Sequence, residues 1–124
     1  MADEIEKLIA DFRNAAIEKG EFADGERDGQ LYDVMARIYH KLDNSGKNGK
    51  DALATLLDDE SVYVRIWVAG SLLIEDNPNA RGVLEEIASR KGVISFNAKI
   101  TLEEFDKGNL TSPFPKRKPN RKKI

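Results

Sequence analysis

Residues 53–73 read LATLLDDESVYVRIWVAGSLL, and this stretch indicates the fold more clearly than any other. A leucine-rich part is followed by an acidic turn and then by a segment that is apolar on nearly every side of a helix. A helix that is apolar all round usually lies at the centre of a domain. The β-branched residues at its start would also suit a strand, but the length of the unbroken run over residues 61–75 favours a helix.

Amphipathic helices are predicted on both sides of this stretch. A chain of 124 residues has the length of one domain, and such a domain buries roughly two thirds of the surface that its unfolded form exposes. Apolar residues recur at helical spacing along most of its length. The sequence therefore predicts an all-α fold of about six helices in antiparallel pairs. The expected helices cover residues 3–19, 27–43, 50–58, 61–75, 79–91 and 94–107.

Turn-forming residues separate the predicted helices. The sequence NSGKNG at residues 44–49 is expected to be a loop. Asn77-Pro78 is typical of a cap followed by proline at the first helical position, which predicts that the fifth helix begins there. The pairs Lys91-Gly92 and Lys107-Gly108 predict the ends of the last two helices, because a cation suits the negative end of the helix dipole and glycine suits the left-handed cap.

Residues 53–73 resemble a HEAT-type repeat, with a leucine-rich first helix, an acidic turn and Val64-Arg65 opening a second helix. A weak internal repeat is also visible, since Leu53 and Leu56 recur as Leu84 and Ile87, but its period is shorter than the ~40–47 residues usual for HEAT units.

Residues 56–110 resemble a family of small uncharacterised bacterial proteins classed only as a domain of unknown function. The similarity lies in Val64-Arg65, in LEEIA at residues 84–88, in FNAK at residues 96–99 and in the ending from Thr101 to Gly108. The resemblance implies a HEAT-like, right-handed superhelical stack. It also implies a binding role, because some such proteins are encoded beside toxins and act as immunity proteins that cover the toxin's active surface. It implies no catalytic motif.

Charge divides the chain into two regions. Residues 109–124 hold six of the 20 basic residues and no acidic one, which leaves 14 basic against 22 acidic residues and a net charge of about −8 for residues 1–108. We predict a single domain over residues 1–108, followed by a basic, proline-containing tail over residues 109–124 that forms no packed core. The basic residues of the tail are Lys116, Arg117, Lys118, Arg121, Lys122 and Lys123.

Two kinds of partner follow from this division. The acidic body favours a basic protein, such as a toxin domain, because charge complementarity speeds encounter and sharpens specificity. The same carboxylates would equally be explained as ordinary parts of solvated helix faces and of helix caps. The tail suits phosphate groups of nucleic acid, although it would also serve as a solubilising segment or fold back on the acidic body. The candidate partner-binding residues are Asp58, Asp59, Glu60, Glu85 and Glu86.

Catalytic, metal and cofactor chemistry finds no support in the sequence. The chain has no cysteine, which excludes disulfides, thiolate metal sites and thiol nucleophiles. His40 is its only histidine and lacks a nearby orienting partner or further metal ligands, so we expect an ordinary, half-exposed side chain. The sequence GKNGK at residues 46–50 has two residues between its glycines where a phosphate loop has four, and Asp51 follows the lysine. The chain is predicted not to be an enzyme.

The environments of two side chains of the central helix can also be predicted. Arg65 lies among apolar residues, and we expect it to pair with Asp58, Asp59 or Asp76, because a buried guanidinium without a partner is costly. Trp67 is expected in the core rather than at a ligand site.

The N-terminal sequence is acidic where a secretory signal is basic, and no apolar run approaches the ~18 residues of a membrane span. Neither export nor membrane insertion is expected, and the cytoplasm is the predicted compartment.

Overall fold

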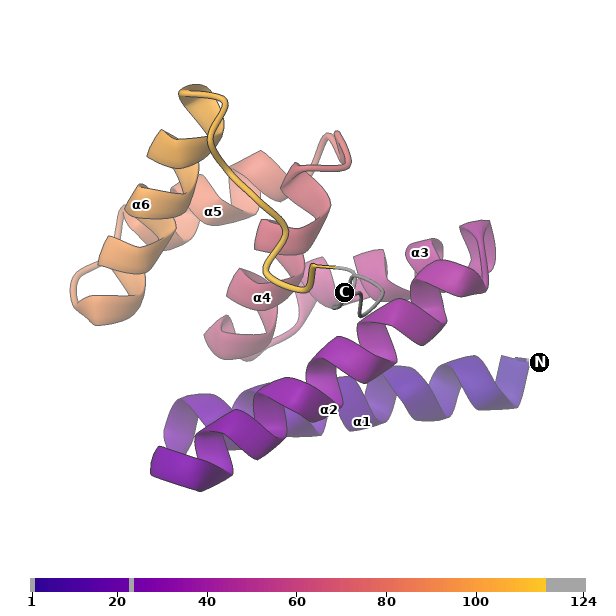
Figure 1. Ribbon diagram of the computed structural model, residues 1–124. Helices are drawn as coiled ribbons and strands as arrows, with labels where there is room; N and C mark the ends of the chain where they lie inside the picture. The colour runs from indigo at the N-terminus through magenta and orange to yellow at the C-terminus, as the bar shows by residue number, and fades with distance from the viewer. Residues whose placement is uncertain (1, 23, 116–124) are drawn as a thin grey trace, which may run out of the picture.

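The structure is a computed structural model that describes residues 2–22 and 24–115, and within these it contains only helices and turns (Figure 1). The all-α prediction is confirmed, and residues 61–75 form no strand. The elements are α1 (Ala2–Glu21), α2 (Gly25–Asn44), α3 (Lys47–Ala54), the 3-10 turn η1 (Thr55–Asp58), α4 (Val62–Leu73), α5 (Ala80–Ala88) and α6 (Val93–Asp106).

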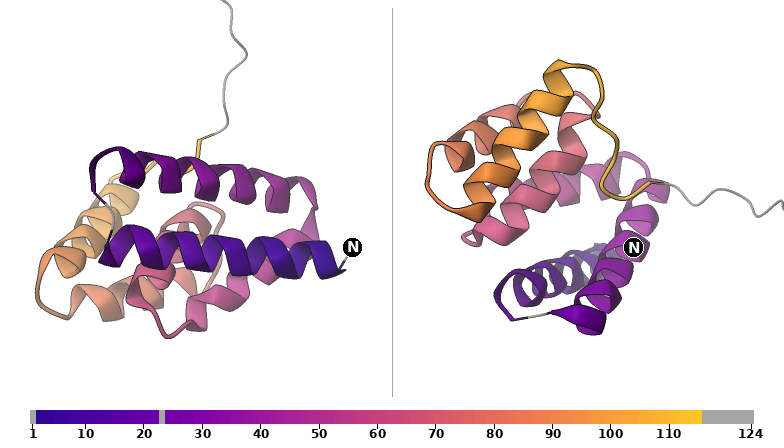
Figure 2. Two further views of the ribbon diagram at one scale, coloured as in Figure 1. Left: turned by 90° about the horizontal axis from the view of Figure 1, so that it is seen from below. Right: turned by 60° about the vertical axis from the view of Figure 1, so that its left-hand side comes forward.

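The helices pack as consecutive pairs in two layers. α1 and α2 form a long antiparallel hairpin, and α4, α5 and α6 pack in succession on the other side of the molecule (Figures 1 and 2). α3 and η1 connect the layers, and α1 also contacts α4. The packing of neighbouring helices agrees with the predicted pairs, while a right-handed superhelical course stays a prediction.

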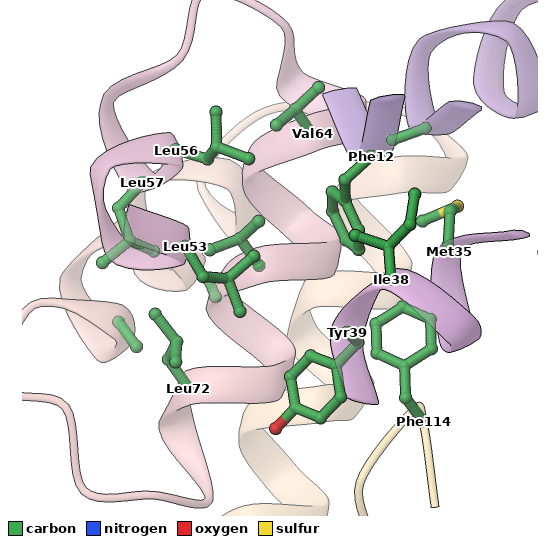
Figure 3. Close-up of a cluster of buried hydrophobic side chains, with 14 of the residues drawn as sticks. Phe12, Met35, Ile38, Tyr39, Leu53, Leu56, Leu57, Val64, Leu72 and Phe114 are labelled. Carbon is green, nitrogen blue, oxygen red and sulfur yellow. The ribbon is translucent and has the colours of Figure 1, made fainter. Parts of the chain in front are cut away.

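α4 lies at the centre, as its apolar composition predicts. Val64, Val68 and Leu72 are buried on this helix, and each such side chain contributes roughly 1.5–3 kcal/mol when fully removed from water. Ser71 is buried as well, and its hydroxyl donates to the main-chain carbonyl of Trp67 at 2.9 Å. Figure 3 shows how leucines of α3 and η1 meet α4 from one side and residues of α1 and α2 meet it from the other.

The predicted loop at residues 44–49 is wrong in its second half, because α3 already begins at Lys47. Gly49 is buried where α3 crosses the end of α2, and a Cβ atom there would lie 1.9 Å from the carbonyl oxygen of Leu42. Glycine is therefore present for close helix packing and not for a loop. The helix predicted over residues 50–58 is helical only in its first part, because its last four residues, 55–58, form the 3-10 turn η1.

The start predicted for the fifth helix at residue 79 is confirmed within one residue, whereas its predicted cap at Asn77-Pro78 and its predicted end at Lys91-Gly92 are wrong. Asn77 and Pro78 lie in a turn before α5, where the side-chain oxygen of Asn77 accepts from the N–H of Asn79 at 2.8 Å. The helix ends at Ala88, before Lys91-Gly92, and the hydroxyl of buried Ser95 lies within hydrogen-bond distance of the carbonyls of Ala88 and Arg90, at 3.0 and 2.6 Å. The predicted end at Lys107-Gly108 is confirmed within one residue, with a positive φ of 78° at Gly108.

Asp76 ends the central helix in the left-handed conformation, with φ at 63°. The N–H groups of Asp76 and Asn77 donate to the carbonyls of Leu73 and Leu72 at 3.1 Å, which is the hydrogen-bond pattern of a Schellman motif. Glycine is the usual residue at this position because a Cβ atom is strained there.

Replacing Asp76 with glycine is expected to raise the free energy of unfolding by about 0.5–1 kcal/mol, because the strain of a Cβ atom at positive φ disappears. Urea denaturation followed by circular dichroism measures the change. Asp33→Gly on the exposed face of α2 is the matched control, and we expect it to lower the stability by roughly 0.5 kcal/mol. If Asp76→Gly were less stable than the wild type, the strain of a Cβ atom at positive φ would not be what decides the stability at this position.

Residues 109–115, which we name the C-terminal strap, return across the molecule after α6 (Figure 2). The prediction that this segment forms no packed core is wrong for Phe114, whose side chain is 1% exposed. The hydroxyl of Tyr32 also donates to the main-chain carbonyl of Pro113. Phe114 inserts among four rings that we name the aromatic cage, with centroid distances of 5.2–5.9 Å to Phe12, Tyr32, Tyr39 and Trp67.

Candidate protein-binding groove

A groove of about 600 Å³ opens between α4, α6, the end of α1 and the C-terminal strap. α4 supplies Ile66 and Trp67, α6 supplies Val93 and Ile94, and Pro113 belongs to the strap. Because the groove combines apolar walls with an open mouth, it is suited to receive apolar side chains from outside.

Few polar groups line the groove. Asn97 and Thr101 project from α6 and Thr111 from the strap. Among the described residues that line the groove, only Lys19 is charged, and its ammonium lies 5.5 Å from the centre of the Trp67 ring and 2.8 Å from the carboxylate of Asp28. Since this charge already has two partners, the described lining of the groove offers hydrogen bonds at its edge but no free charge.

Trp67 belongs to both the core and the groove. Its ring stacks on Phe114 at 5.3 Å with 26° between the planes, and it is only partly buried. The prediction that it lies in the core is therefore incomplete, since the ring also forms part of the groove wall. An aromatic ring held rigidly on one side and open on the other is suited to bind an apolar group.

The acidic candidates lie in a different part of the molecule. Asp58, Asp59 and Glu86 line a shallow depression between η1 and α5, together with Arg65. The carboxylate of Asp59 lies 2.6 Å from Nε of Arg13, and this hydrogen bond is the main cause of a raised pKa at Arg13. The structure thus brings these three carboxylates together beside arginines rather than as a purely anionic surface.

Arg65 uses other partners than those predicted. Its guanidinium donates to the main-chain carbonyls of Asp59 and Glu60 at 2.7 and 3.0 Å and lies 3.9 Å from the carboxylate of Glu86. The expected pairing with a carboxylate of Asp58, Asp59 or Asp76 is wrong, because the turn before α4 leaves two carbonyls without helical donors next to the first turn of that helix.

The other acidic candidates are separate from one another. Glu85 pairs with Arg81 at 3.1 Å, while Glu86 pairs with Arg90 at 2.8 Å. Glu60 is exposed on the turn before α4. The five carboxylates therefore form no continuous acidic strip. The six basic candidates, from Lys116 to Lys123, lie outside the described residues.

His40 is half-exposed, as predicted, and its ring meets that of Tyr39 edge-on at 5.7 Å. The hydroxyl of Tyr39 donates to Glu75 at 2.8 Å, and burial, followed by this hydrogen bond, raises its pKa. Lys47, from the segment compared with a phosphate loop, pairs with Asp51 at 2.6 Å.

Over residues 2–22 and 24–115, no three potential metal ligands among histidines, cysteines and carboxylates come together. In the same part of the chain, no helix combines the length and the apolar character of a membrane span. That the chain is not an enzyme stays a prediction.

The sequence does not predict the groove, because its walls come from elements that are far apart in the chain. The available signal was on α6, where Val93, Phe96 and Ile100 recur at helical spacing and would all lie on one side. Comparison with known protein families, with curated protein sequences and with solved structures finds no match to this chain.

Proposed function

We propose that this chain is a non-catalytic protein-binding module, and most specifically an immunity protein that binds and blocks a basic toxin. The observation that carries the binding role is the open apolar groove beside Trp67, which leaves apolar surface in contact with water in the isolated chain. Covering such a surface with a partner releases that water and favours association. The immunity role rests on the resemblance to small HEAT-like bacterial proteins.

The charge of the body supports a basic partner. Residues 1–108 carry a net charge of about −8, and a field of one sign attracts an oppositely charged protein and raises the association rate at low salt. A toxin that acts on nucleic acid would present a cationic active surface of this kind. The proposed role places the chain in the cytoplasm, together with the target that it protects.

Co-expression with the products of the adjacent genes tests this proposal. We expect one of them to arrest growth on its own, to lose this effect when the chain is present, and to elute with it as a stable complex with a Kd in the nanomolar range or below. The association rate should fall as salt is added, since the attraction between opposite charges is screened. If no neighbouring product forms a complex with the chain at ~10 µM, the immunity role is wrong.

The basic tail supports a second function, which is nucleic-acid binding. Six of the residues between 116 and 124 are basic and none is acidic, so each phosphate contact would release counterions. Fluorescence anisotropy with a labelled DNA duplex should then show salt-sensitive binding that disappears when residues 115–124 are removed. Binding that survives this deletion would contradict the role of the tail.

A further inference from the structure

Of the four large hydrophobic side chains that the described residues leave exposed, three lie on α6 and the fourth follows the end of α1, and both helices contribute to the groove. They are Phe22 at 78%, Val93 at 78%, Phe96 at 60% and Ile100 at 41% exposure. Val93 lines the groove itself, and Phe22 follows by two residues the last groove residue of α1, Gly20. Single exposed hydrophobic residues are common on proteins, but their concentration in one place marks an interaction surface.

α6 presents three of these side chains on one face. At 100° per residue, Val93, Phe96 and Ile100 fall within an arc of about 60°, next to the arc that turns Asn97 and Thr101 toward the groove. The opposite side of α6 is buried, as at Ala98. α6 follows α5 at the end of the helical layer, so its outer face has no further helix against it in the described part of the chain (Figure 2). We name the groove and this face together the α6 surface.

Carboxylates flank the α6 surface at both ends. Glu21 and Asp24 adjoin Phe22, and Glu103 lies one turn beyond Ile100. All three are exposed, and none forms an ion pair with another described residue. Exposed lysines also lie before and within α6, so the preference for an occupant whose apolar side chains are bordered by lysine or arginine rests on these carboxylates together with the net charge of about −8 on residues 1–108.

The backbone of the chain limits how such an occupant can bind. A partner strand needs an exposed sheet edge with free N–H and carbonyl groups, and residues 2–22 and 24–115 contain no strand. A helix needs only an apolar groove, into which it places side chains three or four residues apart. The spacing of the exposed side chains on α6 matches that repeat.

We propose that the α6 surface is the docking site for an amphipathic helix of the partner protein, with an apolar face bordered by lysine or arginine. This inference rests on the proposed protein-binding function and names the surface and the chemistry of its partner. The helix would lie along α6, place apolar side chains beside Trp67, and set its cations opposite the carboxylates at the two ends.

Trp67 provides the measurement, because it is the only tryptophan and lines the groove. The probes are two synthetic, tryptophan-free peptides of ~18 residues with leucine at helical spacing, one with lysine and one with glutamate at all other positions. The leucine–lysine peptide should shift the Trp67 emission saturably, with a Kd at least about tenfold below that of the leucine–glutamate peptide. Equal affinities would overturn the assigned partner chemistry.

Variants then locate the binding surface. The double substitution Val93→Ser and Phe96→Ser keeps the net charge and alters only exposed side chains, so we expect an unchanged circular dichroism spectrum and a Kd raised at least about tenfold. Ala10→Ser, on the exposed face of α1, is the matched control and should bind as the wild type does. Lys99→Gln on α6 should strengthen binding of the leucine–lysine peptide by removing a like charge. Unchanged affinity of the double variant would overturn the docking site.

The same double variant separates this inference from the proposed function. If the product of an adjacent gene binds the wild type and the double variant equally well, the chain is a protein-binding module that uses another surface, and the inference is wrong. If that product binds the wild type at least about tenfold more tightly, the inference is supported with the natural partner. If no neighbouring product binds the wild type, the immunity role fails, while the peptide titration still decides on the α6 surface.

Discussion

Replacing Phe114 with alanine is expected to lower the free energy of unfolding by about 3–5 kcal/mol, the range observed when a fully buried phenylalanine is removed from a core. The side chain is 1% exposed and contacts rings from α1, α2 and α4. Its removal would leave a cavity between the two layers that these rigid rings fill poorly. Urea denaturation should show a lower midpoint with an unchanged slope.

Two further variants set the scale for this measurement. Phe22→Ala truncates the same kind of side chain at a position that is 78% exposed, so its effect should stay within about 0.5 kcal/mol. Phe114→Leu keeps most of the buried volume and should cost less than Phe114→Ala. A loss below about 1 kcal/mol for Phe114→Ala would mean that the strap is not part of the core.

Replacing Gly49 with alanine should destabilise the protein by at least about 3 kcal/mol or prevent folding, because the new Cβ atom overlaps the backbone of α2. Its position lies 1.9 Å from the carbonyl oxygen of Leu42 and 2.7 Å from the carbonyl carbon. The intrinsic preference of alanine over glycine in a helix, about 1 kcal/mol, acts in the opposite direction and is too small to compensate. Thermal unfolding followed by circular dichroism provides the measurement.

Gly29→Ala is the control for this change. Gly29 lies in the exposed part of α2, and a Cβ atom there would have nothing within 4 Å. The helix preference then acts alone, and we expect a gain of about 1 kcal/mol. A Gly49→Ala protein that is as stable as the wild type would show that α3 does not pack against the end of α2 as described.

The central helix could be predicted from sequence because its signal is local. An apolar run bounded by turn residues specifies both a helix and its burial, and α4 has both. The prediction of a loop at Gly49 fails because it rests on the same kind of local signal: Asn48 and Gly49 are weak helix formers, and the close packing of Gly49 against α2 is not visible in the local sequence. Local preference was overridden there by tertiary packing.

Burial in the C-terminal strap could not be predicted from local composition. Phe114 stands between two prolines and ahead of a basic run, a composition typical of unpacked segments. Its partners are rings in α1, α2 and α4, and a single sequence does not record such distant contacts. The groove cannot be predicted from local composition either, because the strap forms one of its walls.

The acidic candidates illustrate a related limit. Asp59 is recognisable as a charge, but its partner Arg13 lies 46 residues away, on α1. Sequence reports the number of charges and not the pairs that they form, so it overestimates the anionic surface near η1.

The position of Phe114 in the chain has a consequence for biosynthesis. Domains generally fold as units during translation, and Phe114 is made after all six helices of the described chain. Until it leaves the ribosome, the rings of Phe12, Tyr32 and Tyr39 lack the side chain that packs against all three of them. The nascent protein should therefore complete its packing late, with these aromatic rings open to chaperones until Phe114 emerges.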